Sequence, residues 1–199
     1  MPARLPAGSI ALWRTQSGRV TASADRCPHR GMRLSHGFVR GEALSCIYHG
    51  WSYGQTGECL RIPAHPGLTP PETIRVAVHA VEEAWGVIWV AVGETTAEPP
   101  RFEGFVPLRS LTAHADIAAL KAATGATAGP AGLGWPAPGA PEIRLLSVPQ
   151  EGYETLIHVM VPGDSSPAQR IAASRAAETL RRTAENIQAK GLAPWRTTR

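Results

Sequence analysis

The sequence is poor in several features, and each shortage narrows the class of protein. The chain has 199 residues and only three cysteines, an odd number that is too small for a disulfide framework. No apolar run comes near the roughly 18 residues of a membrane span, so we expect no membrane-spanning helix. Residues 1–13 lack the long apolar stretch of a secretory signal, and we therefore expect a cytoplasmic protein.

Lysine is nearly absent, because Lys121 and Lys190 are the only lysines among 20 lysine and arginine residues. The net charge of +4 arises in residues 165–199, which carry seven basic and two acidic groups. No aromatic or recognition pattern accompanies these arginines, so we expect no nucleic-acid binding. The basic segment is interpreted as the solvated face of a helix, with a docking surface for an acidic partner as the alternative.

The first half of the chain predicts β structure. One hairpin is expected over residues 10–22, and a second over residues 75–92 with its turn at Glu82 and Glu83. Glycines recur at short intervals over residues 31–57, with only short apolar pieces between them. This pattern predicts small twisted sheets that are joined by tight turns.

The second half predicts a mixture of helix and strand. Residues 115–123 give a weak helical signal. Residues 122–141 carry no charge, and sixteen of the twenty are Ala, Gly or Pro, which indicates a flexible linker or, alternatively, an ordered surface loop. Alternating apolar residues over 142–161 predict a β-hairpin. A capping box over residues 166–169 then begins one long helix that ends near Gly191.

The expected apolar face of this helix contains Ile171, Ala176, Leu180, Ala184 and Ile187. The predicted fold is a mainly β N-terminal domain of small antiparallel sheets and a small α+β C-terminal segment. The boundaries are 1–98 for the domain, 99–141 for a Pro/Gly/Ala-rich connector, and 142–199 for the hairpin and helix.

Four residues in two short segments suggest a metal centre: Cys27, His29, Cys46 and His49. Their spacing is Cys-x-His, sixteen residues, then Cys-x-x-His. A soft thiolate suits zinc or iron, and neutral imidazole suits either metal. The four side chains could hold one tetrahedral zinc ion. They could equally hold a [2Fe–2S] cluster, in which two histidines replace two cysteines on one iron.

The flanking residues favour the iron–sulfur cluster. The segments Cys27-Pro28-His29-Arg30-Gly31 and Cys46-Ile47-Tyr48-His49-Gly50-Trp51 resemble the Rieske [2Fe–2S] domain of the ring-hydroxylating oxygenases. The resemblance covers residues 10–92, including the apolar run at 85–90. It implies a Rieske cluster and a protein that passes single electrons.

The resemblance also implies a role for each ligand. Cys27 and Cys46 would hold one iron, and His29 and His49 the other. The histidines would lie at the domain edge, so the electron would leave near the surface. The third cysteine, Cys59, is interpreted as structural.

The class of Rieske protein follows from what stands near the ligands. Respiratory Rieske proteins carry a disulfide between the two cluster loops, whereas the corresponding positions here are Met32 and Tyr48. Trp51 stands where those proteins have a serine that donates a hydrogen bond to cluster sulfur. Fewer such bonds stabilise the reduced cluster less, so we expect a low reduction potential.

A second metal site of the family is not recognised in this sequence. The family's oxygenases bind mononuclear iron through two histidines and a carboxylate, from an Asp/Glu-x-x-His-x(4–5)-His motif and a later Asp that the sequence lacks. We therefore expect no mononuclear Fe(II) and assign no catalytic residue. The segment 142–199 resembles a shortened catalytic domain of the family. The remaining histidines are interpreted as ordinary strand or loop residues: His36, His65, His79, His114 and His158.

Three functions follow as hypotheses. The first is an electron-transfer protein that takes electrons from an NAD(P)H-dependent reductase or a ferredoxin and passes them to an oxygenase. The second is an oxygenase component beside a partner subunit, in an oligomer, that supplies the mononuclear iron. The third is a non-catalytic redox sensor or a relic.

Overall fold

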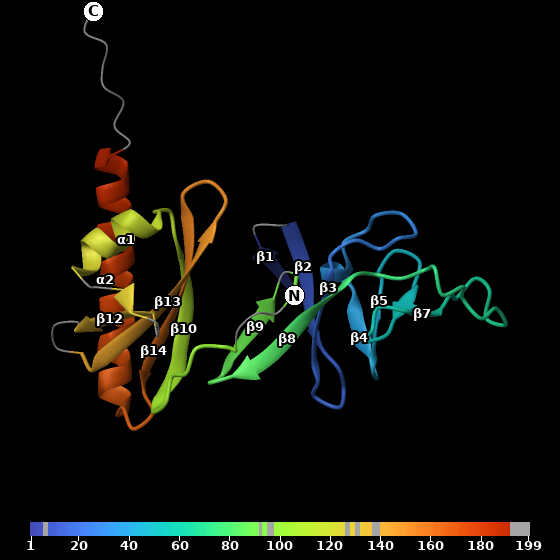
Figure 1. Ribbon diagram of the computed structural model, residues 1–199, viewed down its shortest axis with the longest axis horizontal. Helices are drawn as coiled ribbons and strands as arrows, with labels where there is room; N and C mark the ends of the chain where they lie inside the picture. The colour runs from blue at the N-terminus through green and yellow to red at the C-terminus, as the bar shows by residue number, and fades with distance from the viewer. Residues whose placement is uncertain are drawn as a thin grey trace, which may run out of the picture. The chain divides into compact units, whose positions relative to one another are not determined.

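The computed structural model describes residues 1–5, 8–91, 93–94, 98–125, 128–129, 132–136 and 140–191. The chain divides into two compact units (Figure 1). Unit 1 comprises Met1–Ala84 and Ile88–Pro99, and unit 2 comprises Trp85–Val87 and Pro100–Arg199. Each unit has its own hydrophobic core. Among the helices described, none is both long and apolar enough to cross a membrane.

Two sheets and a short 3-10 helix, η1 (Leu34–His36), build the N-terminal part. The five-stranded sheet has the order β1 (Pro2–Leu5), β2 (Gly8–Arg14), β3 (Val20–Ala24), β8 (Val78–Ala84) and β9 (Val87–Ala91). The four-stranded sheet has the order β4 (Phe38–Arg40), β5 (Ala43–Ser45), β6 (Ser52–Tyr53) and β7 (Cys59–Arg61). The predicted small antiparallel sheets are therefore confirmed.

The two predicted hairpins differ in outcome. The first is confirmed, because β2 and β3 pair antiparallel with Trp13 opposite Thr21. The turn predicted at Glu82 and Glu83 is wrong, since both lie inside β8. The chain instead turns at Trp85 and Gly86, with φ of 58° and 71°. Two consecutive left-handed residues give a turn whose twist matches that of the flanking strands.

Unit 2 contains a five-stranded antiparallel sheet and two helices. The strand order is β10 (Phe105–Ala113), β14 (Glu154–Pro162), β13 (Glu142–Gln150), β12 (Gly132–Pro136) and β11 (Ala128–Gly129). The helices are α1 (Ile117–Thr124) and α2 (Pro167–Gly191). The predicted hairpin and long helix are confirmed, but the sheet around them is larger than predicted.

The segment 99–141 differs from the connector that its composition suggested. It contains β10 and α1, and β12 pairs with β13 so that Trp135 lies opposite Ile143. Residues 126–127, 130–131 and 137–139 of the expected linker lie outside the described residues. Strands pair through backbone hydrogen bonds, which do not depend on the kind of side chain. The Ala, Gly and Pro content of this segment therefore suggested a linker and gave no sign of the strand pairing. The boundaries at 98 and 141 stay predictions.

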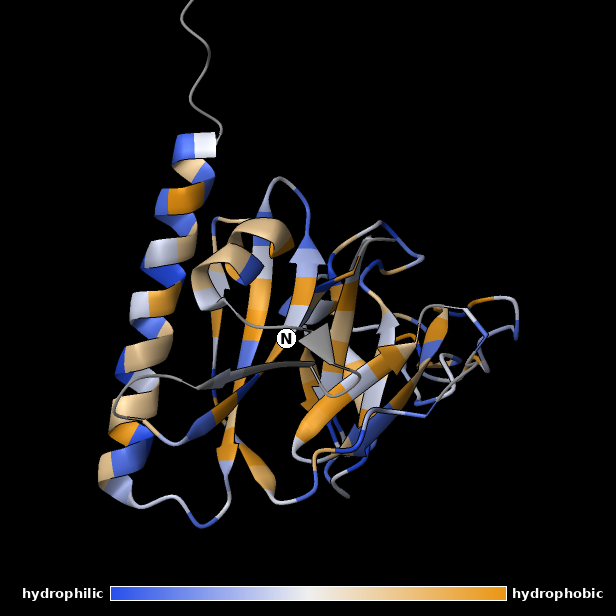
Figure 2. Cartoon of the chain, turned by 60° about the vertical axis from the view of Figure 1, so that its left-hand side comes forward, coloured by the Kyte–Doolittle hydropathy of each residue, from blue (hydrophilic) through white to orange (hydrophobic). Residues whose placement is uncertain are grey.

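Helix α2 begins as the capping box predicts. The Ser166 amide donates to Gln169 Oε1 at 2.8 Å, and the Gln169 amide donates to Ser166 Oγ at 3.3 Å. Figure 2 shows hydrophobic and hydrophilic residues alternating along the helix. Its buried residues are Ala173, Ala177, Leu180, Ala184 and Gln188. Ile171 is 54% exposed, so its predicted place on the apolar face is wrong. Small alanines line the buried face and allow the helix to pack closely on the sheet.

Candidate metal centre

Two loops of unit 1 carry the four predicted ligands. The first cluster loop, residues 26–33, connects β3 to η1, and the second cluster loop, residues 46–51, connects β5 to β6. Both loops leave short strands that are fixed by sheet pairing, so the ends of each loop are held in place.

The two cluster loops follow the same turn. In each loop, the glycine four residues after the cysteine donates its amide to the cysteine carbonyl: Gly31 to Cys27 at 2.8 Å, and Gly50 to Cys46 at 2.9 Å. Gly31 and Gly50 have φ of 69° and 71°, a conformation that side chains with a Cβ rarely adopt. The equivalent turns explain why each motif needs its glycine.

The predicted cysteine ligands form one pair in the core. Cys27 is 3% exposed and Cys46 is 2% exposed, and both belong to the core of unit 1. Burial is the largest cause that raises the pKa of the Cys46 thiol, and the neighbouring Cys27 raises it further. The backbone amides of Tyr48 and His49 act in the opposite direction by hydrogen bonding to Cys46. They thus favour the thiolate, which is the metal-binding form.

The predicted histidine ligands form a second pair, at the surface. The rings of His29 and His49 have centroids 4.6 Å apart. Trp51 stacks on His29 with centroids 4.4 Å apart and planes within 3°, and Tyr48 packs on His49 at 3.9 Å. His49 is exposed and His29 is half-buried. The pKa of His29 is lowered, mainly by burial and to a smaller extent by the charges of His49 and Arg30. The lowered pKa favours the neutral imidazole.

This arrangement fits a [2Fe–2S] cluster of Rieske type. The thiols lie together in the core and the imidazoles lie together at the surface, as a cluster with two cysteines on one iron and two histidines on the other requires. In the part of the chain that the structure describes, no group of three or more His, Cys, Asp or Glu residues could hold a single metal ion.

Sequence reasoning missed Tyr53. Its hydroxyl lies 3.1 Å from Cys27 Sγ, and the side chain is 1% exposed. Burial, and then hydrogen bonding to Cys27, raises the pKa of Tyr53 far above its ordinary value. The hydroxyl therefore keeps its proton and can donate it to a thiolate at Cys27. The place of Tyr53 two residues beyond Trp51, in strand β6, was the available signal.

Sequence reasoning also missed Asp25, which anchors the start of the first cluster loop. Its buried carboxylate accepts hydrogen bonds from the hydroxyl of Ser9 and from both the amide and the hydroxyl of Ser35. These bonds tie β2, the end of β3 and η1 together. Asp25 thus fixes the strand end from which the loop departs.

The third cysteine and the other histidines have separate surroundings. Cys59 is buried in the unit 1 core, and its thiol donates to the carbonyl of Arg61 at 3.7 Å. In unit 2, His158 Nδ1 lies 2.7 Å from the hydroxyl of Ser110. His114 Nδ1 lies 3.2 Å from a carboxylate oxygen of Glu154.

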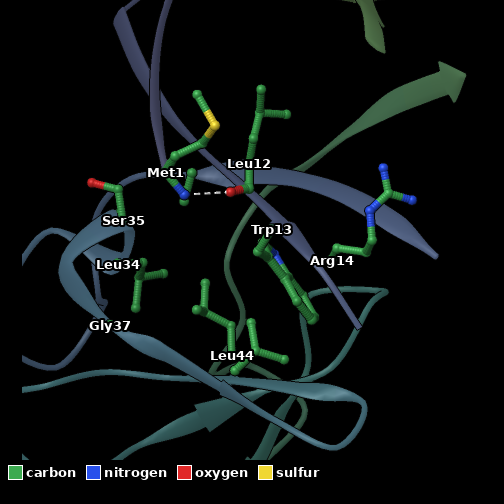
Figure 3. A pocket seen from close by; sticks show the side chains of 10 residues that line it. Met1, Leu12, Trp13, Arg14, Leu34, Ser35, Gly37 and Leu44 are labelled. Atoms are coloured by element: carbon green, nitrogen blue, oxygen red, sulfur yellow. Dashed lines mark hydrogen bonds between the residues drawn. The ribbon is translucent and has the colours of Figure 1, made fainter. Parts of the chain in front are cut away.

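Unit 1 also contains a pocket of about 240 Å³ beside β2 (Figure 3). Leu34, Leu44 and Trp13 contribute to its lining, and none of the four predicted ligands does. At its rim, the amino group of Met1 donates to the Leu12 carbonyl at 2.6 Å. The pocket is therefore separate from the cluster loops.

Comparison with known proteins agrees with this geometry. Residues 3–79 match the family model of the Rieske [2Fe–2S] domain. The chain is 46% identical over 91 residues to Oxidoreductase NdmD of Pseudomonas putida. This match covers 45% of this chain and 16% of that protein. The chain is 38% identical over 97 residues to the 3-chlorobenzoate-3,4-dioxygenase oxygenase subunit of Comamonas testosteroni, and this match covers 47% of this chain and 22% of that protein.

Solved structures resemble the chain over a longer stretch. NdmA of Pseudomonas putida CBB5 superposes with a TM-score of 0.71 at 20% identity, covering all of this chain and 78% of that one. Apo dicamba monooxygenase superposes with a TM-score of 0.73 at 18% identity, and the match covers 96% of this chain and 82% of that one. At these identities the likeness shows the fold alone.

The paired thiols, the paired imidazoles and the family match define an iron–sulfur domain. The N-terminal part of the chain is a Rieske [2Fe–2S] domain related to those of ring-hydroxylating oxygenase subunits. The aligned part spans only about a sixth to a quarter of the curated relatives' own length.

Proposed function

We propose that the chain is an electron-transfer protein whose [2Fe–2S] cluster is held by Cys27, His29, Cys46 and His49. When bound, the cluster takes up and releases one electron. The buried thiol pair beside an imidazole pair at the surface supports this proposal, because it gives a bound cluster a shielded side and a side open to a partner. His49 is the exposed ligand, so it provides the shortest route to the surface.

The chain's own residues would perform three tasks around the cluster. The amides of Tyr48 and His49 and the hydroxyl of Tyr53 would stabilise negative charge on the cysteine sulfurs. Trp51 would hold the ring plane of His29. Burial of both cysteines would keep water from the sulfurs. No catalytic residue and no mononuclear iron belong to this proposal.

The proposed partners are an NAD(P)H-dependent reductase or a ferredoxin as electron donor, and an oxygenase as acceptor. A cytoplasmic location is part of the same proposal, and fractionation of cells that produce the protein tests it.

Replacement of single cysteines tests the ligand assignment. We expect Cys46→Ser to lose bound iron and the visible Rieske absorption. Cys59→Ser is the matched control, because Cys59 is also buried but its thiol donates to a carbonyl, and we expect it to keep both signals. An unchanged spectrum in Cys46→Ser would refute the assignment.

The second candidate is an oxygenase component that works beside a subunit with its own mononuclear iron. The 38% identity over 97 residues to the 3-chlorobenzoate-3,4-dioxygenase oxygenase subunit favours it. Copurification of a larger subunit carrying the two-histidine, one-carboxylate motif would support this candidate. A stable protein that purifies alone and transfers electrons would count against it.

A further inference from the structure

The pocket beside β2 is built by side chains from four separate elements of unit 1. Trp13 lies on β2, Leu34 on η1, Val39 on β4 and Leu44 on β5. The indole of Trp13 reaches from β2 toward Leu44 (Figure 3). Trp13, Leu34 and Leu44 are buried, so tertiary packing fixes these walls, whereas Val39 is 37% exposed and lies on the solvent side. A concave, mostly apolar and pre-formed cavity is the usual form of a small-molecule site.

The indole of Trp13 gives this lining a polar group without a partner. Its Nε1–H is buried and makes no hydrogen bond within the part of the chain that the structure describes. A buried donor without an acceptor is costly, and native proteins leave few such groups. Because the same indole lines the pocket, an acceptor atom on a bound molecule would satisfy this donor.

The other polar side chains of the lining already have partners. The guanidinium of Arg14 donates to both carboxylate oxygens of Glu83, at 2.7 and 2.5 Å, and to the carbonyl of Gly18. The hydroxyl of Ser35 donates to Asp25 at 2.9 Å. The charge of Arg14 is therefore compensated, and the lining favours a neutral molecule with an acceptor for Trp13.

The size of the pocket limits the molecule to about one ring. An engineered apolar cavity of about 150 Å³ binds benzene, so a pocket of about 240 Å³ accommodates one aromatic ring with a short substituent. We propose that this pocket binds a small, neutral, single-ring molecule whose oxygen accepts a hydrogen bond from Trp13 Nε1. The site is separate from the four predicted ligands and does not rest on the proposed electron transfer.

Two probes of nearly the same shape test the binding. Acetophenone carries a carbonyl oxygen, and α-methylstyrene has a methylene group in its place, so only acetophenone can accept a hydrogen bond. Equilibrium dialysis against the intact protein, with its metal centre, measures the dissociation constant of each probe. We expect acetophenone to bind with a dissociation constant of about 1 mM or lower, which is ordinary for a ligand of this size.

The ratio of the two dissociation constants reports on the Trp13 hydrogen bond. Comparing this ratio between the variant Trp13→Phe and the unmodified protein cancels the difference in hydrophobicity between the probes. We expect Trp13→Phe to lower the preference for acetophenone by roughly three- to tenfold. A merely structural role of Trp13 would weaken both probes alike. An unchanged ratio would therefore overturn the proposal.

A second variant tests the pocket while Trp13 stays in place. Val39→Phe adds bulk at a partly exposed lining residue, so we expect it to fold and to lose binding of both probes. Leu60→Phe is the matched control, because Leu60 is an exposed strand residue that is not part of the lining. We expect this control to bind both probes like the unmodified protein.

Three results would contradict the site. Binding that is the same in Val39→Phe as in the unmodified protein would overturn the proposal, as would equal losses in Val39→Phe and Leu60→Phe. Tighter binding of benzoate than of acetophenone would assign the pocket to an anion, and would also overturn it. Circular dichroism of each variant checks that the fold is retained.

Discussion

The hydroxyl oxygen of Tyr53 lies 3.1 Å from the sulfur of Cys27 in the core of unit 1. A hydrogen bond to a cysteine ligand stabilises the reduced cluster more than the oxidised one, because the reduced cluster carries more negative charge. A typical hydrogen bond contributes about 0.5–1.5 kcal/mol. For a one-electron couple this corresponds to roughly 20–65 mV.

We therefore expect Tyr53→Phe to lower the reduction potential by a few tens of millivolts, measured by spectroelectrochemistry. Tyr48→Phe is the matched control, since it removes a hydroxyl from an exposed tyrosine in the second cluster loop. A potential that is the same in both variants and in the unmodified protein would show that the Tyr53 hydroxyl does not act on the cluster.

Gly31 gives a test of the shared loop geometry. A side chain at φ of 69° costs about 1–2 kcal/mol. No atom lies within 4 Å of an added Cβ, so the cost comes from the backbone alone. Gly31→Ala should lower the unfolding temperature and the iron content per chain. Gly67→Ala, where φ is ordinary and the space is open, should change neither.

The capping box of α2 predicts a stability effect in unit 2. Ser166→Ala removes the acceptor for the Gln169 amide, and should reduce the free energy of unfolding by about 1 kcal/mol. Urea unfolding followed by circular dichroism measures this change. Ser166→Asp keeps a capping oxygen and should restore most of the loss. A loss in Ser166→Asp as large as in Ser166→Ala would contradict the capping role.

Acid should weaken α2 through Glu178. Hydrogen bonding to Arg181 is the largest cause that lowers the pKa of Glu178 to about 2, from an ordinary 4.5. Because the pKa is depressed in the folded state, the ion pair stabilises the fold fully above pH 4.5. That contribution is lost as the pH falls towards 2.

Glu178→Gln should therefore be less stable than the unmodified protein at neutral pH, and the difference should shrink as the pH falls below 4.5. Unfolding curves across this range measure it. Glu151→Gln, at an exposed turn, should show no such trend. A difference that stays constant with pH would contradict the ion-pair explanation.

The sequence predicted the parts of the structure that depend on local patterns. The Cys-x-His-x-Gly and Cys-x-x-His-Gly motifs identified both loops, and Ser166 identified the start of α2. Tyr53 and Asp25 were missed because their roles depend on partners, Cys27 and Ser35, that only the folded chain brings close. Strand β12 was missed because its pairing with β13 is a long-range backbone interaction that composition does not report.

The most direct test of the central claim is metal analysis of anaerobically purified protein, with optical and electron-spin-resonance spectra before and after dithionite. The account predicts two irons per chain and a Rieske signal that appears on reduction. A third, spectroscopically distinct iron would contradict the expectation that mononuclear iron is lacking. A colourless protein with one zinc ion would contradict the cluster itself.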